Sequence, residues 1–227
     1  MLKKLLSYIF PVKIYQKKSF LSKNIEITYN NGKIVMDSEN TNYSYGSLQK
    51  ILRKGLRFVG FEIIKSMDHV LVLGVAGGSV IKTLVNEIGY DNKITGVDVD
   101  SEIIELANKF FELNKIKNLK IVIADAFEFV LKTKIKYNLI IIDVFQDTEM
   151  PNFLFENFFM HRIVEILNLN GFVIFNTMLL KKEHHQRNKQ FLLETNAIKG
   201  IRAVAMKRIA NHNELIIISK EPFGQLS

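Results

Sequence analysis

Three short apolar runs of the sequence end in an aspartate: Asp98, Asp125 and Asp143. Asp143 ends a fully apolar run, which is hard to explain by packing, because a buried carboxylate needs a partner. Carboxylates accept hydrogen bonds from hydroxyl and amino groups, and a well-placed carboxylate can take a proton from a nucleophile. These three residues are therefore our first candidates for ligand binding and acid–base chemistry.

A fourth apolar run leads into a glycine-rich loop and then directly into a helical pattern. The loop contributes five candidate ligand-binding residues: Gly74, Val75, Gly77, Gly78 and Ser79. Glycines let a backbone approach a ligand closely, and the start of a helix offers free N–H donors. The spacing differs from the strict G-x-G-x-x-G fingerprint, so a tight strand-to-helix turn without a ligand remains the alternative.

Of the three candidate aspartates, Asp98 follows this loop most closely in the chain, about 20 residues after the glycines. A carboxylate at that place is positioned to accept both hydroxyls of a ribose. Val99 follows it and is included in the predicted cofactor site. Asp100 begins the next helical pattern, where an aspartate can serve as the N-cap.

The other two strand ends predict different roles. Asp125, followed by Ala126, can accept a hydrogen bond from the amino group of an adenine. It can also cap the helix that follows, and the two roles are compatible. Asp143 ends the most apolar run, and we expect it directly above the glycine loop, as part of both the cofactor site and the catalytic machinery.

Alternating strand and helix patterns must position these residues. Runs rich in Val and Ile predict strands over His69–Gly74, Lys93–Asp98, Leu119–Ala124, Tyr137–Asp143 and Gly171–Asn176. Helical spacing separates them, over Ser79–Ile88, Ser101–Leu113, Ala126–Lys132 and Asn152–Leu167. Such alternation predicts βαβ units and a parallel sheet with both faces covered. Ligands of these sheets bind beyond the carboxyl ends of the strands, where the aspartates and the glycine loop stand.

The two ends of the chain differ from this pattern. Ile201–Arg208 and Glu214–Lys220 flank a tight turn and predict a closing antiparallel hairpin, which favours the class I methyltransferase architecture over a plain Rossmann fold. Residues 25–36 contain Asn31-Gly32 between two β-rich runs, a strong hairpin signal. A helical pattern spans 47–65. We therefore expect an N-terminal segment with a β-hairpin over 1–42 and a Rossmann-like domain over 43–227.

Composition excludes several classes of protein. The 227 residues include 48% hydrophobic residues and no cysteine, which excludes a disordered chain, disulfides, a thiolate metal site and a cysteine nucleophile. A reducing cytoplasm fits this composition. No stretch is long enough to span a membrane, and the apolar run of residues 5–10 lacks the features of a cleaved signal peptide.

The formal net charge of +8 raises the question of nucleic acid. Of the 31 Lys and Arg residues only 6 are Arg, and the lysines are spread along the whole chain. Arginine is the side chain suited to bidentate phosphate contacts, so we expect no specific nucleic-acid partner. The pair His184-His185 lies in a polar helical pattern and predicts a solvated face, and no metal site is expected. Four phenylalanines after Pro151 are interpreted as core or dimer-interface residues: Phe153, Phe155, Phe158 and Phe159.

Taken in order, these motifs resemble spermidine synthases and their relatives. The resemblance rests on the loop 74–79, the strand end 97–100, the segment 124–128, Asp143 with the following acids and Pro151, and the upstream stretch 36–49. It covers roughly residues 25–220. It implies a seven-stranded class I methyltransferase fold that binds S-adenosylmethionine or its decarboxylated form.

The resemblance also implies catalytic residues, and it has departures. Asp143 matches the family's presumed base, Tyr45 matches a substrate-site tyrosine, and Asp147 lies where an acid stands near the second amine. Gly77 replaces an aspartate of the family's first loop. Gly46 and Ser47 replace polar residues that help to hold the aminopropyl donor and the amine.

These departures led us to expect an S-adenosylmethionine-dependent methyltransferase that acts on a small, amine-type acceptor and binds S-adenosylmethionine at least as tightly as its decarboxylated form. Two alternatives stay open: a polyamine aminopropyltransferase using decarboxylated S-adenosylmethionine, and a non-catalytic cofactor-binding partner protein. A homodimer is compatible with the sequence.

Overall fold

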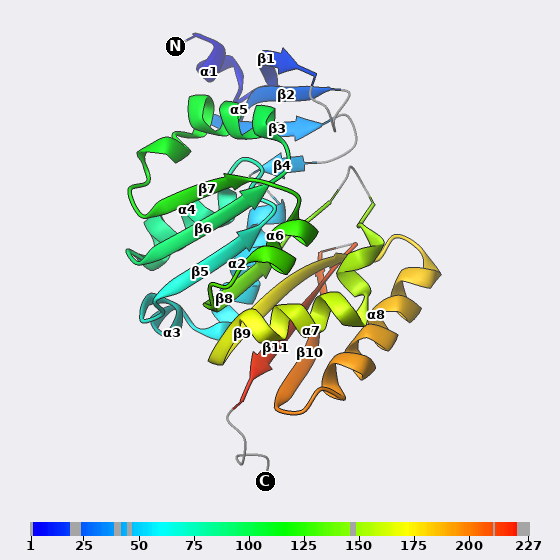
Figure 1. Ribbon diagram of the computed structural model, residues 1–227. Helices are drawn as coiled ribbons and strands as arrows, with labels where there is room; N and C mark the ends of the chain where they lie inside the picture. Colours follow the sequence, from blue (N-terminus) through cyan, green and yellow to red (C-terminus); the bar gives the residue numbers. More distant parts are fainter. Residues whose placement is uncertain are drawn as a thin grey trace.

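The computed structural model describes residues 2–18, 24–38, 42–44, 47–145, 149–210 and 212–221. They form a seven-stranded sheet with helices on both faces and a separate four-stranded antiparallel sheet. Figure 1 shows the small sheet beside α5 (Ser101–Phe111), at the opposite end of the molecule from the last residues of the final strand, Asn213–Lys220.

The large sheet has the strand order β10-β11-β9-β8-β5-β6-β7. Its strands are β5 (His69–Leu73), β6 (Lys93–Asp98), β7 (Leu119–Ile123), β8 (Tyr137–Ile142), β9 (Leu167–Met178), β10 (Ile201–Ala210) and β11 (Asn213–Lys220). The first five are parallel, and β11 pairs antiparallel with both β9 and β10. The predicted fold class, including the closing hairpin, is confirmed.

Helices cover both faces of the sheet and create two apolar cores. One face carries α2 (Ser47–Val59), α3 (Phe61–Lys65), α4 (Ser79–Lys82) and α5, and the other carries α6 (Ala126–Lys132), α7 (Asn157–Ile166) and α8 (Lys182–Asn196). Leu56 and Leu106 belong to the first core, while Val130, Ile163 and Phe191 belong to the second. Because the central strands are buried on both sides, they read as continuous apolar runs rather than alternating ones.

The small sheet contains β1 (Val12–Lys17), β2 (Ile25–Asn30), β3 (Lys33–Ser38) and β4 (Asn42–Ser44), and α1 (Leu2–Leu6) precedes it. The turn between β2 and β3 has positive φ at both Asn31 (49°) and Gly32 (73°), which is the geometry predicted for that hairpin. Tyr15 packs on Phe110 of α5, with 5.4 Å between the ring centroids. The division of the chain at 42/43 remains a prediction.

Three predicted helices are interrupted, each at a definable place. The pattern over 47–65 breaks at Gly60, whose φ of 104° ends α2 before α3 begins. The pattern over 79–88 becomes a π-helix from Thr83 to Ile88, and the Thr83 hydroxyl donates back to the Ser79 carbonyl at 3.0 Å. The third becomes a 3-10 turn, Asn152–Phe155, followed by α7. No helix within the described ranges combines the length and apolar character that crossing a bilayer requires.

Candidate active site

The glycine loop lies between the carboxyl ends of β6 and β8. Backbone hydrogen bonds fix it there: the Gly74 N–H donates to the Val97 carbonyl at 2.9 Å, and the Asp143 N–H donates to the Leu73 carbonyl at 2.8 Å. Gly74 has φ of 85°, and a Cβ at this residue would clash with the backbone carbonyl oxygen of Asp143. Glycine is therefore required here both for its conformation and for the close approach of two strand ends.

Asp98 lies beneath this loop and organises it. One carboxylate oxygen, Oδ2, accepts hydrogen bonds from the backbone N–H groups of Val75 and Ala76, each at 2.9 Å. The other, Oδ1, accepts from the Asp100 N–H at 3.0 Å. Burial raises the pKa of Asp98, and the three N–H donors oppose that rise by stabilising the ionised form. Asp98 thus links the glycine loop to the start of α5.

This bonding bears on the predicted ribose contact. A carboxylate offers about four acceptor positions, and Asp98 uses three of them within the chain. One acceptor position remains, so accepting both hydroxyls of a ribose requires Asp98 to release a backbone donor. The ribose role of Asp98 stays a prediction.

The turn from the loop into α4 is tightly packed. Gly77, Gly78 and Ser79 are all buried. Gly78 has φ of 74°, and a Cβ there would clash with the side chain of Leu113. Its N–H donates to the Val75 carbonyl at 2.8 Å, so this donor is already used within the turn. Packing and an internal hydrogen bond therefore account for this turn. Binding of a ligand by these residues stays a prediction.

The next two strand ends carry helix caps. Asp100 accepts from the N–H groups of Glu102 and Ile103 and caps α5, as expected. Asp125 caps α6 in the same way, with both capping bonds to Oδ1. Asp125 is exposed, so its second oxygen faces solvent and is compatible with the predicted adenine contact. Val99 is 48% exposed, which leaves an apolar side chain accessible at this edge.

Asp143 is an acid whose pKa the fold raises strongly. Burial raises its pKa from 3.8 to about 6, although a hydrogen bond from Asn176 partly opposes the rise. The Asn176 amide nitrogen donates to Asp143 Oδ1 at 2.8 Å. The Asn213 amide in turn donates to Asn176 Oδ1 at 3.1 Å, which orients the Asn176 amide. Asp143 is therefore a carboxyl held in place by β9 and β11.

Sequence reasoning missed Asn176 and Asn213. Asn176 is fully buried and ends the apolar run of β9, so the rule that singled out the three aspartates would have found it. Asn213 lay inside the predicted turn, where asparagine is common. Only the antiparallel pairing of β11 with β9 brings it to Asn176.

A second polar cluster lies one residue further along the same strands. Asn188 of α8 donates to both Glu214 Oε2, at 2.8 Å, and Thr177 Oγ1, at 2.7 Å. Arg187 lies over the ring of Phe155 at 3.8 Å, and burial lowers its pKa to about 10. This cluster attaches α8 to β9 and β11. Sequence analysis did not predict it.

The remaining candidates have separate outcomes. Tyr45 and Asp147 lie outside the described residues. Phe159 is buried in the core, where it packs on Phe127 and Phe153, whereas Phe158 is 65% exposed. Among the described residues, no group of three or more His, Asp or Glu side chains is placed to hold a metal ion.

The sheet order, the glycine turn after its first strand and the acids at its carboxyl edge define a class I methyltransferase-like fold. Within that class, a profile of the spermine/spermidine synthase domain matches residues 56–219. The chain belongs to this family, which confirms the resemblance seen in the motifs.

Individual proteins show how far the similarity extends. A polyamine aminopropyltransferase of Prochlorococcus marinus (strain MIT 9312) is 32% identical over 114 residues, which are 48% of this chain and 40% of that protein. A probable spermidine synthase from Corynebacterium glutamicum superposes with a TM-score of 0.74 at 16% identity, covering 95% of this chain and 82% of the other. Human methyltransferase-like protein 13 in complex with SAH superposes with a TM-score of 0.65 at 19% identity. The superposition covers 81% of this chain and 86% of the human protein's chain.

The chain matches about two fifths of the length of that curated relative. The structural neighbours, at these identities, show the fold alone.

Proposed function

We propose that this protein is an aminopropyltransferase, which moves the aminopropyl group of decarboxylated S-adenosylmethionine to a small amine. The observation that carries the proposal is the half-buried carboxyl of Asp143, beside the glycine loop and with a pKa raised to about 6. Family membership supports the same reading, because the curated relatives are polyamine aminopropyltransferases. The expectation of methyl transfer becomes the second candidate.

The chemistry requires a neutral amine, since an ammonium has no free electron pair. Asp143 accepts the proton that the amine loses as its nitrogen bonds to the donor carbon, while the carbon–sulfur bond breaks and sulfur becomes a neutral thioether. A carboxyl with a raised pKa is a stronger base than an ordinary aspartate. It also attracts the cationic form of the amine into the site before the proton is lost.

The residues present fit an adenosyl sulfonium donor at the carboxyl edge. Gly74 keeps the floor of the loop free of a side chain, Val99 offers an exposed apolar surface, and Asp125 offers an acceptor to an amino group. When bound, the donor supplies an electrophilic carbon. The protein's own residues hold it, position the amine and receive the proton.

One observation favours methyl transfer as the second candidate. Gly77, with no side chain, stands where the family's first loop carries an aspartate. The terminal ammonium of an aminopropyl donor would lose a charge-assisted hydrogen bond worth about 1.5–3 kcal/mol. S-adenosylmethionine has a carboxylate in addition, which backbone N–H groups can bind without any side chain.

A paired assay separates the two reactions. The purified protein is incubated with putrescine and either decarboxylated S-adenosylmethionine or S-adenosylmethionine, and the amine products are identified by mass spectrometry. We expect an aminopropylated product from the decarboxylated donor. N-methylated putrescine from S-adenosylmethionine, with no aminopropylated product, would instead establish the second candidate.

Variants of single residues test whether the reaction takes place at the proposed site. We expect Asp143→Asn to lower the rate by about a hundredfold or more, the usual contribution of a positioned base. Asp91→Asn is the matched control: it removes an exposed carboxylate from the loop before β6, at the opposite edge of the sheet. Equal rates for the wild type and Asp143→Asn would show that Asp143 is not the base.

A further inference from the structure

A cavity of about 570 Å³ opens on the α6 face of the sheet, away from the proposed active site. Its floor is formed by β5, β6 and β7, and its wall by α6 and the connection to β8. The cause is local: α6 has only seven residues, about 10 Å of helix, so it does not cover the length of the strands beneath it. Ligand cavities in proteins commonly fall between about 300 and 1,000 Å³.

The interior of this cavity is apolar with a few polar groups. Leu119, Val122 and Phe129 line it together with the buried Tyr137. The Tyr137 hydroxyl is buried and has no hydrogen-bond partner among the described residues, although Thr95 and Thr133 lie nearby. Buried hydroxyl groups normally have a partner, and the two threonine hydroxyls are the nearest candidates for this one.

His69, the first residue of β5, also lines the cavity. Its Nε2 is 2.9 Å from the Thr95 hydroxyl, and its ring meets the Tyr137 ring edge-on, with 4.6 Å between centroids. Burial and the charge of Lys93 both lower the pKa of His69, so the imidazole is neutral at neutral pH. The interior therefore has no fixed charge of its own.

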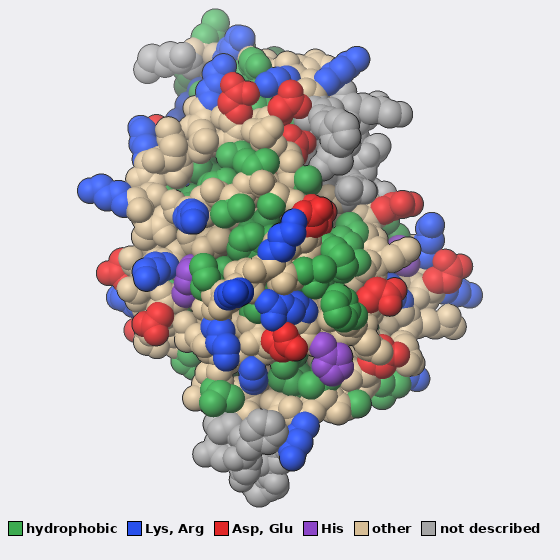
Figure 2. Space-filling view, viewed as in Figure 1, with side chains coloured by type: hydrophobic (Ala, Val, Ile, Leu, Met, Phe, Trp, Pro, Cys, Tyr) green, Lys and Arg blue, Asp and Glu red, His purple; other side chains and the backbone are tan. Residues whose placement is uncertain are grey.

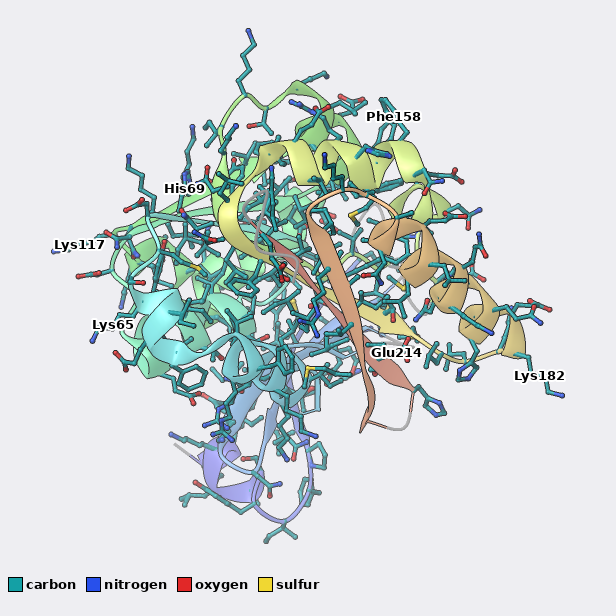
Figure 3. The ribbon with its side chains drawn as sticks, turned by 90° about the horizontal axis from the view of Figure 1, so that it is seen from below. Lys65, His69, Lys117, Phe158, Lys182 and Glu214 are labelled. Atoms are coloured by element: carbon teal, nitrogen blue, oxygen red, sulfur yellow. The ribbon has the colours of Figure 1, made fainter. Side chains whose placement is uncertain are left out.

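The rim of the cavity is cationic. Lys93, Lys117 and Lys120 are exposed there, and none of them forms an ion pair with another described residue. The acid on this rim, Glu128, is paired with Lys132 at 2.6 Å. Figure 2 shows apolar side chains exposed over β6 and β7 with lysine and arginine side chains beside them. Figure 3 places His69 and Lys117 on one side of the molecule, opposite Glu214 and Lys182.

We propose that this cavity binds a small amphipathic organic anion, with its apolar body over Val122 and Phe129 and its carboxylate among Lys93, Lys117 and Lys120. A neighbouring cavity of about 500 Å³ shares His69, Lys93 and Asn118 but includes Asp68 and Asp91. These acids place the anionic end on the side of Lys117 and Lys120. The proposal is independent of the proposed function and adds a second ligand site.

On β6 the two sites lie at different ends, whereas on β7 the cavity lining extends to Ala124, the residue before Asp125. Lys93 begins β6 and Asp98 ends it, which separates them by roughly 16 Å at 3.3 Å per residue. The cavity lining contains neither the glycine loop nor Asp98 or Asp143. A ligand in the cavity therefore leaves the glycine loop, Asp98 and Asp143 uncovered.

Octanoate and octylamine form a suitable pair of probes, because they share an eight-carbon chain and differ in the sign of their charge. The chain has only 5 histidines, so a carbon–proton correlation spectrum of the histidine rings resolves His69, with His69→Gln used for assignment. We expect octanoate to shift the His69 resonances in a saturable manner. Octylamine should shift them at least tenfold more weakly.

Charge reversal at the rim tests the anionic contact. Lys120→Glu should weaken octanoate binding about tenfold, because an attraction becomes a repulsion at short range. Lys182→Glu is the matched control, since it makes the same change of net charge at an exposed position on the opposite side. We expect it to leave the affinity within twofold.

Four results would overturn the proposal: no octanoate-dependent shift of His69 at millimolar probe, equal binding of octylamine, equal weakening by the two charge reversals, or competition between octanoate and S-adenosylmethionine. Far-ultraviolet circular dichroism of each variant checks folding, so that a loss of binding is assigned to the rim. Octanoate titration in the presence of S-adenosylmethionine tests separation from the donor site. Unchanged octanoate affinity supports the second site, and competition between the two ligands contradicts it.

Discussion

At the scale of single residues, Asp143 combines a structural cost with a chemical use. Its pKa rises from 3.8 to about 6 on folding, so the folded chain binds this proton more tightly than the unfolded chain. The contribution of Asp143 to the free energy of unfolding is therefore fully present below pH 4 and is lost as the pH rises through 6. A pKa rise of this size lowers the free energy of unfolding by up to about 3 kcal/mol at neutral pH.

We accordingly expect Asp143→Asn to raise the free energy of unfolding by about 1–3 kcal/mol at pH 7.5, even though it removes activity. Asparagine keeps the shape and can still accept the hydrogen bond from Asn176. Urea unfolding followed by circular dichroism measures the difference at pH 7.5 and at pH 4. A gain that is the same at both values would show that ionisation of Asp143 is not its origin.

Asp98 presents the opposite case, because its carboxylate satisfies three backbone donors. Asp98→Ala leaves the N–H groups of Val75 and Ala76 without their acceptor, and we expect a loss of about 2–4 kcal/mol in the free energy of unfolding. Donor affinity should fall as well, since the loop loses its support. Asp125→Ala, which removes an exposed cap, serves as the comparison and should cost about 1 kcal/mol.

Isothermal titration with each sulfonium donor measures the binding part of this prediction. If Asp98→Ala unfolds at the same urea concentration as the wild type, the loop does not depend on Asp98. That outcome would also remove the structural reason for placing a ligand there.

At the scale of elements, the contact between the β5–α4 loop and the end of β8 depends on a single glycine. Gly74 and Gly89 both have positive φ, 85° and 73°, but only Gly74 faces backbone at close range. A Cβ at Gly89 would meet nothing nearer than the Lys65 side chain at 3.9 Å. Gly89→Ala should therefore cost about 1–2 kcal/mol from conformation alone.

Gly74→Ala adds a steric clash to that conformational cost, and we expect a loss of at least about 3 kcal/mol together with displacement of Asp143. Thermal unfolding of the two variants compares them directly. Equal losses would mean that the strand ends can separate without cost.

The ladder from Asn213 through Asn176 to Asp143 joins β11, β9 and β8. Because the hydrogen bond from Asn176 lowers the pKa of Asp143, Asn176→Ala should raise that pKa above its value of about 6. The acidic limb of the pH–rate profile should then move to higher pH. Thr177→Ala, the adjacent buried residue in a different network, should lower stability without moving that limb.

At the scale of the whole molecule, the net charge of +8 comes mainly from lysines spread over the surface. Scattered lysines give only non-specific phosphate contacts, so any binding to duplex DNA should be weak and should decrease steeply with salt. Fluorescence anisotropy with two unrelated duplexes, at 50 and 150 mM salt, measures this. Sub-micromolar, sequence-dependent binding at the higher salt would reverse the conclusion drawn from the scarcity of arginine.

The sequence by itself determined the succession of strands and helices along the chain, the hairpin at Asn31-Gly32, the caps at Asp100 and Asp125 and the position of the glycine loop. These features depend on neighbouring residues, whose periodicity and turn preferences are local properties. The break between α2 and α3 at Gly60 also has a local cause. The sequence did not reveal it, because the apolar positions on both sides keep the same helical spacing.

Only the tertiary structure decided which groups meet across the sheet. The pairing of Asn213 with Asn176, the occupation of Asp98 by backbone donors and the cavity beneath the short helix α6 all join segments separated in the chain. Such contacts depend on strand order and register, which residue periodicity does not encode. The pKa of Asp143 likewise follows from burial by several elements at once, so no local pattern could have predicted it.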